Sequence, residues 1–99
     1  MLESKIEDKL RRLLQRRGAM VWKFVSPGQA GVPDRLVILP GGRCVFIELK
    51  TETGRLSPVQ KVVIERMRKQ GCDVRVVHGW EEAQAVADEI LPGGESSGV

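Results

Sequence analysis

Two acids and a lysine stand at the ends of two apolar, β-rich runs of the sequence. Asp34 precedes the run 36–39, while Glu48 and Lys50 lie at the end of the run 44–49. Both runs are rich in Val, Ile and Phe, and a short Pro-Gly-Gly turn signal separates them, which predicts a β-hairpin. Strands this apolar are usually buried on both faces, where charged side chains are rare unless they are paired or functional.

The length of the turn sets the register of this hairpin. With a three-residue Pro-Gly-Gly loop, Leu39 faces Arg43, and counting back along both strands places Asp34 directly opposite Glu48. Opposed Cβ atoms in such a pair lie about 4.5–5.5 Å apart. Lys50 projects from the same face as Glu48, because side chains alternate along a strand. The three charged groups are therefore expected to form one cluster.

Two carboxylates at this separation repel each other unless a counter-charge neutralises them. A divalent cation does so and takes oxygen ligands readily. The ammonium group of Lys50 would then hold or deprotonate a water, or offset charge that develops on a phosphate. The cluster therefore indicates a metal site. The alternative is a surface cluster of opposite charges at the open end of a hairpin.

Composition bounds the class of protein. The chain has 99 residues, of which 41% are hydrophobic, and this predicts one small domain with a real core. We expect the domain to span residues 1–91 and to be followed by a disordered tail over 92–99. All 16 lysines and arginines but only 8 of the 13 acids lie in residues 1–79, so the body of the domain is basic and suits nucleic acid. No long apolar run or signal-type segment is present, which predicts an intracellular protein with no membrane contact, and the two cysteines are expected to be reduced.

Three helices and four strands are expected to position the cluster. Helical periodicity predicts helices over 2–17, 57–70 and 80–90, and β-rich runs predict strands over 20–25, 36–39, 44–49 and 73–78. The predicted fold class is α/β, with the order α-β-β-β-α-β-α and a mixed sheet of about four strands flanked by helices. The second helix is expected to bury Val59, Val63 and Met67.

The first two helices carry polar residues that can reach the hairpin. Glu7 falls at the edge of the apolar stripe of the first helix, and Glu3, one turn earlier, is the alternative acid. Both acids also suit the positive end of the helix dipole. Ser57, Pro58 and Gln60 form a capping-box pattern at the start of the second helix, which gives Gln60 a structural role independent of any site.

A longer pattern resembles a known family. Pro33-Asp34, followed 14 residues later by Glu48-Leu49-Lys50, resembles the Pro-Asp…(Asp/Glu)-x-Lys motif of a nuclease superfamily. The wider strings 31–35, 41–43, 46–50 and 56–60 are similar to the virus-type replication-repair nuclease (VRR-NUC) domain within that superfamily. The resemblance covers roughly residues 3–90 and implies a restriction-endonuclease-like core.

The resemblance implies a role for each site residue. The implied catalytic set is Glu7, Asp34, Glu48, Lys50 and Gln60. Asp34, Glu48 and the main-chain carbonyl of Leu49 would ligate Mg²⁺ or Mn²⁺, with Glu7 as a further candidate and Glu3 as its alternative. Lys50 would orient or activate the attacking water, and Gln60 would support the site while capping its helix. We expect DNA contacts from Arg11, Lys23, Ser26, Arg35, Arg55 and Lys61.

The implied activity is that of a metal-dependent, structure-specific endodeoxyribonuclease. It would hydrolyse phosphodiesters in branched double-stranded DNA, as a Holliday-junction resolvase does, in the cytoplasm of a bacterium or of a phage-infected host. Family members that consist of this domain alone are expected to be homodimers. Two other hypotheses stay open: a flap, nicking or restriction-like nuclease, and an inactive accessory module that binds DNA.

Overall fold

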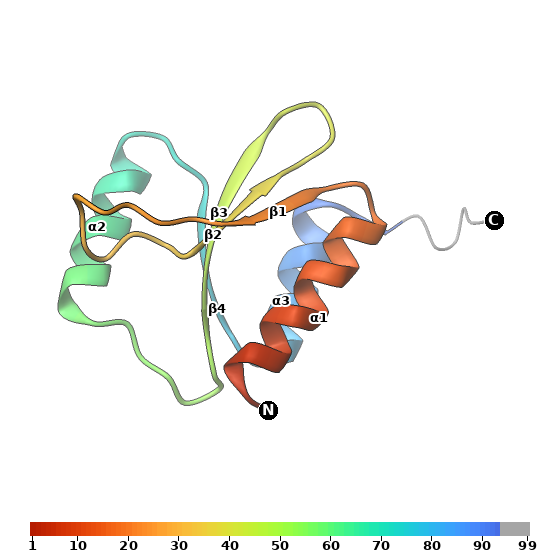
Figure 1. The fold of residues 1–99 in the computed structure, drawn as a ribbon, viewed down its shortest axis with the longest axis horizontal. Helices are drawn as coiled ribbons and strands as arrows, with labels where there is room; N and C mark the ends of the chain where they lie inside the picture. The colour runs from red at the N-terminus through yellow and green to blue at the C-terminus, as the bar shows by residue number, and fades with distance from the viewer. Residues whose placement is uncertain (94–99) are drawn as a thin grey trace.

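A four-stranded mixed sheet lies between two layers of helices in the computed structural model, which describes residues 1–93 (Figure 1). The elements are α1 (Glu3–Arg16), β1 (Met20–Lys23), β2 (Arg35–Ile38), β3 (Cys44–Lys50), α2 (Pro58–Lys69), β4 (Val74–His78) and α3 (Gly79–Ile90). The expected α/β class and the order α-β-β-β-α-β-α are confirmed. None of the helices in this described part has the length and apolarity needed to span a membrane. Most of the predicted tail, 92–99, lies outside the described residues.

The sheet has the strand order β1-β2-β3-β4. β1, β2 and β3 pair antiparallel, and β4 pairs parallel to β3 after the crossover through α2. The N–H of Leu39 donates to the carbonyl of Arg43 at 2.8 Å and closes the three-residue turn. Arg35 then lies opposite Ile47. The predicted hairpin register is therefore confirmed.

The two faces of β3 have different surroundings. Val45, Ile47 and Leu49 are buried in the main core, which α1 and α3 cover side by side (Figure 1). The remaining members of this core include Ile6, Leu10, Leu14, Val37, Val77, Ala83 and Ala87. Because strand side chains alternate, Glu48 and Lys50 project from the other face, which carries α2.

α2 begins with the predicted capping box. The Ser57 hydroxyl accepts from the N–H of Gln60 at 3.1 Å, and the Gln60 side-chain oxygen accepts from the N–H of Ser57 at 2.9 Å. The expected burial of Val59 is wrong, because this side chain is 46% exposed. The helix is rotated so that Val63 and Ile64 are its buried residues. This rotation also turns Gln60 toward the sheet.

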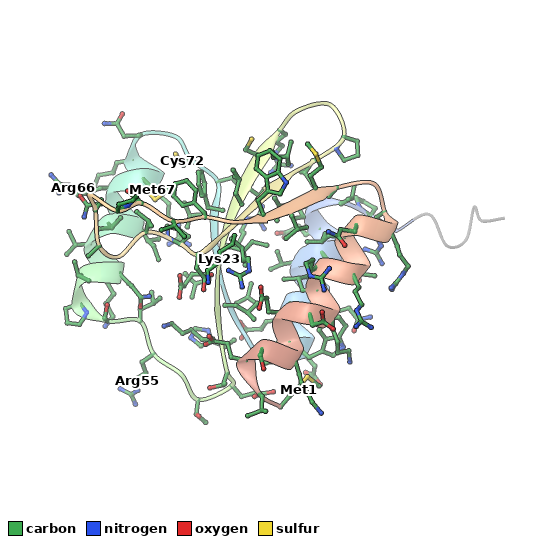
Figure 2. The ribbon with its side chains drawn as sticks, viewed as in Figure 1. Met1, Lys23, Arg55, Arg66, Met67 and Cys72 are labelled. Atoms are coloured by element: carbon green, nitrogen blue, oxygen red, sulfur yellow. The ribbon has the colours of Figure 1, made fainter. Side chains whose placement is uncertain are left out.

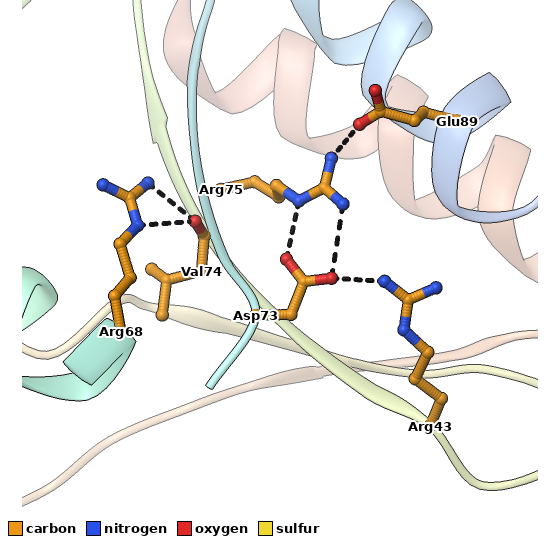
Figure 3. A network of polar contacts seen from close by, with 6 residues as sticks. All are labelled: Arg43, Arg68, Asp73, Val74, Arg75 and Glu89. Atoms are coloured by element: carbon orange, nitrogen blue, oxygen red, sulfur yellow. Dashed lines mark hydrogen bonds and ion pairs between the residues drawn. The ribbon is translucent and has the colours of Figure 1, made fainter. Parts of the chain in front are cut away.

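A polar network ties β4 to its neighbours at the end of the sheet remote from Lys50 (Figure 3). Asp73 accepts hydrogen bonds from Arg43 after the hairpin turn and from Arg75 Nε at 2.6 Å. The bond from Arg75 is the main cause that lowers the pKa of Asp73. Arg75 also pairs with Glu89 of α3. Arg68 of α2 donates to the carbonyl of the first β4 residue at 2.7 and 3.1 Å.

Gly31→Ala is expected to destabilise the fold by about 2 kcal/mol or more. Gly31 has φ +85°, which strains any L side chain, and an added Cβ would lie 2.9 Å from the main-chain oxygen of Val59 in α2. Urea unfolding measures the loss. Gly41→Ala is the matched control, since Gly41 has φ +95° and no atom within 4 Å of an added Cβ. Equal losses for the two variants would contradict a specific contact with α2.

Candidate active site

Asp34 and Glu48 form the centre of the site. Asp34 immediately precedes β2, and the confirmed register, continued by one residue, places it opposite Glu48. The Asp34 carbonyl accepts from the N–H of Phe24 and from Arg35 Nη1, both at 2.8 Å, which fixes its backbone. One oxygen of each carboxylate, Asp34 Oδ1 and Glu48 Oε1, is buried without a hydrogen-bond partner. A buried acceptor without a partner costs free energy. These two oxygens would therefore be stabilised by a bound cation or by a further hydrogen-bond donor.

The second oxygen of Glu48 is held by two donors. Gln60 Nε2 donates to Glu48 Oε2 at 3.1 Å, and Lys50 Nζ lies 3.4 Å from the same atom. The carboxylate of Glu48 is only 5% exposed, and Lys50 is also largely buried. Gln60 therefore both caps α2 and contacts Glu48. The structure brings together Asp34, Glu48, Lys50 and Gln60 of the expected catalytic set.

The electrostatics of the pair favour a bound positive charge. Burial raises the pKa of Glu48 above its ordinary value of 4.5, and the neighbouring charge of Asp34 raises it further. Burial also raises the pKa of Asp34 above 3.8, and the charge of Glu3 adds to this effect. The charge of Lys50 lowers both values without cancelling the rise. Ionising both carboxylates is therefore costly unless a cation compensates.

Arg35 links Glu7 to Asp34, because it pairs with Glu7 and its Nη1 also lies 4.0 Å from Asp34 Oδ2. Arg35 follows Asp34 on the strand, so its side chain turns to the opposite face, where it forms an ion pair with Glu7 of α1. Arg35, an expected DNA contact, is only 16% exposed and already contacts both Glu7 and Asp34. Sequence reasoning missed the pairing, because alternation puts Arg35 on the same strand face as Val37 but does not say that α1 is the helix covering that face. Glu3 is the α1 acid whose charge reaches Asp34.

The available ligands for a metal are few. Within residues 1–93, no three or more His, Cys, Asp or Glu side chains gather in a group that could hold a metal ion. A cation at the Asp34–Glu48 pair would therefore take two side-chain carboxylates. The hydrocarbon side chain of Leu49 has no ligating atom and lies in the main core, so this residue can contribute only its main-chain oxygen.

The other expected DNA contacts lie on different segments of the fold. Lys23 ends β1, and Arg55 extends outward from the connection between β3 and α2 (Figure 2). Lys61 lies in the first turn of α2. All three are exposed, and the charge of Lys23 lowers the pKa of Asp34. Ser26 is half-buried in the loop after β1. Arg11 pairs with Asp8 on α1 instead of reaching out freely.

Comparisons with known proteins identify the family of this chain. A family model described as the VRR-NUC domain matches residues 1–81. A curated protein of Acyrthosiphon pisum secondary endosymbiont phage 1, named "Putative nuclease p44", is 45% identical over 58 residues. The match covers 59% of this chain and 62% of the length of that relative.

Two solved structures have the same fold. One, titled "VRR_NUC domain", is 32% identical with a TM-score of 0.82, over 87% of this chain and 94% of its own. The other, titled "VRR_NUC domain protein", is 18% identical with a TM-score of 0.72, over 94% of this chain and 91% of its own. The second likeness is one of fold alone.

Proposed function

The chain belongs to the VRR-NUC domain family, and we propose that it is a metal-dependent, structure-specific endodeoxyribonuclease that cuts branched DNA as a Holliday-junction resolvase does. One observation carries the proposal. Asp34 Oδ1 and Glu48 Oε1 are buried acceptors without partners, one from each of two opposed carboxylates. Lys50 and Gln60 complete this arrangement by holding the remaining oxygen of Glu48.

The residues present fit Mg²⁺ or Mn²⁺. Every available donor is an oxygen, from Asp34, Glu48 and the main chain of Leu49, and hard divalent cations prefer such ligands. Two ionised carboxylates with raised pKa values also gain most from a bound positive charge. When bound, the cation supplies a positive charge that polarises the scissile phosphate and stabilises the leaving oxygen.

The chain's own residues orient the reaction. Lys50, which lies 3.4 Å from Glu48 Oε2, orients the attacking water and offsets the negative charge that grows on the phosphate. Gln60 fixes the Glu48 carboxylate by donating to Oε2, which leaves Oε1 without a protein partner and able to bind the metal. The exposed cations Lys23 and Arg55 would contact the phosphate backbone of the bound DNA.

The proposal includes a homodimer. A single chain, with principal-axis extents of 44 × 31 × 20 Å, has little surface with which to bind a four-way junction. A two-fold dimer would present two equivalent sites to the two strands of a symmetric junction. Light scattering coupled to size exclusion tests this part of the proposal separately, and a monomer at the concentrations used for cleavage would contradict it.

A panel of DNA structures tests the activity. Labelled four-way junction, flap and linear duplex DNA are incubated with the protein in Mg²⁺, in Mn²⁺ and in EDTA. We expect cleavage that needs the metal and is fastest on the four-way junction, with none by the Asp34→Ala protein. Equal metal-dependent activity of the Asp34→Ala protein would overturn the site. Faster flap or duplex cleavage would overturn the junction preference alone, and DNA binding without any cleavage would favour an accessory module.

Two substitutions separate the structural and catalytic roles of Gln60. Ser57→Ala removes half of the capping box and is expected to cost about 1 kcal/mol of stability with cleavage retained. Gln60→Glu keeps an oxygen for the Ser57 N–H but puts a third carboxylate beside Glu48, so cleavage is expected to fall by about tenfold or more. Thermal melts and initial rates measure the two effects. Parallel losses of rate in both variants would show that capping alone explains Gln60.

A further inference from the structure

Four cations form a stripe along one side of α1. Lys5, Lys9, Arg12 and Arg16 recur every three or four residues, and all four are exposed. This spacing places them in a row on the helix surface. At 1.5 Å per residue, the row is about 16 Å long. We call it the α1 stripe.

The α1 stripe borders a hollow between α1 and α3. The hollow has a volume of about 290 Å³ and is lined by Lys9, Arg12, Leu13, Arg16, Trp80 and Gln84, with no acid among them. Lys9 Nζ lies 4.3 Å from the centre of the Trp80 ring. This cation–π contact restrains the lysine, so less side-chain freedom is lost when an anion binds. Asp8, on the same helix, pairs with Arg12 at 2.9 Å and also with Arg11.

The α1 stripe is separate from the candidate active site. α1 packs on the sheet face opposite to the one that carries Glu48, Lys50 and α2. Glu7 of α1 pairs with Arg35 of the hairpin, whereas three stripe residues line a hollow with Trp80 and Gln84 of α3. Figure 1 shows α1 and α3 together across the sheet from α2.

We propose that the α1 stripe and the adjoining hollow bind the sugar-phosphate backbone of a second DNA segment, other than the one being cut. Duplex DNA carries one negative charge per about 1.7 Å of its axis, so several phosphates span a row of this length. A single small anion would engage only one end of it. The inference rests on the proposed function for its ligand class, and it gives branched DNA a second point of contact on the same chain.

The test compares two double substitutions that each remove one lysine and one arginine. Lys9→Gln with Arg16→Gln neutralises half of the α1 stripe. Arg66→Gln with Lys69→Gln removes the same charge from exposed positions of α2, which lies across the sheet from α1 (Figure 1). Binding of labelled four-way junction and linear duplex DNA is measured by fluorescence anisotropy in EDTA over a range of salt concentrations. Circular dichroism checks that both variants are folded.

Loss of two phosphate contacts has a defined signature. The stripe variant is expected to bind the junction roughly tenfold or more weakly at ~0.1 M salt, and its plot of log K against log salt should be shallower by about 2. In the α2 variant, both the affinity for the junction and the slope of log K against log salt should change much less. A charge-preserving swap, Lys9→Arg with Arg16→Lys, should bind as the unaltered protein does.

Three outcomes would overturn the inference. The first is an equal loss of junction affinity in the two glutamine variants, and the second is an unchanged salt dependence of binding in the stripe variant. The third is that the stripe substitutions weaken binding to anionic phospholipid vesicles but leave DNA binding unaffected. Because binding is measured without metal, the result does not depend on cleavage. A protein that binds through the stripe but does not cut would refute the proposed activity and leave this inference standing.

Discussion

Glu48→Gln is expected to lower the cleavage rate by at least about 10³-fold and, at the same time, to raise the melting temperature of the metal-free protein at neutral pH. The loss of activity follows from removing one of two carboxylates that face each other at the site. The gain in stability follows from burial, because Glu48 is almost wholly enclosed beside Asp34 and its ionised form is costly. A shift of a few degrees is readily measured, since about 1 kcal/mol moves the midpoint of a domain this size by about 4–8 °C.

The sign of this effect depends on pH. The pKa of Glu48 is higher in the folded protein than its ordinary value of 4.5, mainly because of burial. The folded state therefore binds the proton more tightly than the unfolded state does. The contribution of Glu48 to stability is fully present below about pH 4.5 and is lost as the pH rises through the folded pKa. Glu48→Gln should thus stabilise the metal-free protein above that range and make little difference below it.

Thermal melts in EDTA at several pH values measure this prediction. Glu65→Gln is the control, because Glu65 is an exposed acid of α2 whose side chain is 70% accessible. Adding Mg²⁺ or Mn²⁺ should raise the melting temperature of the unaltered protein and leave that of the Glu48→Gln protein nearly unchanged. A lower melting temperature of the metal-free Glu48→Gln protein would show that the buried, ionised Glu48 does not destabilise the fold.

Lys50→Met is expected to slow cleavage by about 10²–10³-fold while DNA binding is retained. Methionine keeps much of the length and apolar stem of lysine but removes the ammonium group. That group lies 3.4 Å from Glu48 Oε2 and lowers the pKa of Glu48. Its removal should therefore also destabilise the metal-free protein at neutral pH, which is the opposite of the effect of Glu48→Gln.

Single-turnover cleavage at saturating DNA separates the loss of rate from any loss of binding. The double variant with Glu48→Gln gives a second check, because Lys50 loses its role as counter-charge once Glu48 is neutral. The stability cost of Lys50→Met should then largely disappear. A cost that is the same in both backgrounds would show that Lys50 stabilises the fold by packing alone.

Local rules were enough to predict the hairpin and its cluster. A three-residue turn fixes the register of two antiparallel strands, and alternation then places Asp34, Glu48 and Lys50 on one face. The capping box of α2 was also readable, because its parts are adjacent in sequence. Each of these predictions depends on residues within one element or one turn.

Features that depend on how elements pack were not predictable in the same way. Helical periodicity suggested that Val59 would be buried, but the rotation of α2 is set by the fit of Ile64 and Gln60 against the sheet. The pairing of Glu7 with Arg35 depends on which face of the sheet α1 covers. That choice is made by the whole core and not by the sequence near Glu7.

The two ends of the Gln60 amide have different duties, and this links catalysis to local order. Its oxygen closes the first turn of α2 on Ser57, and its nitrogen holds Glu48. Whenever that turn frays, the amide is released at both ends and Glu48 loses a donor. Fraying of the first turn of α2 and loss of the Gln60–Glu48 hydrogen bond therefore occur together. A copy with a frayed α2 lacks the complete site with which to nick DNA.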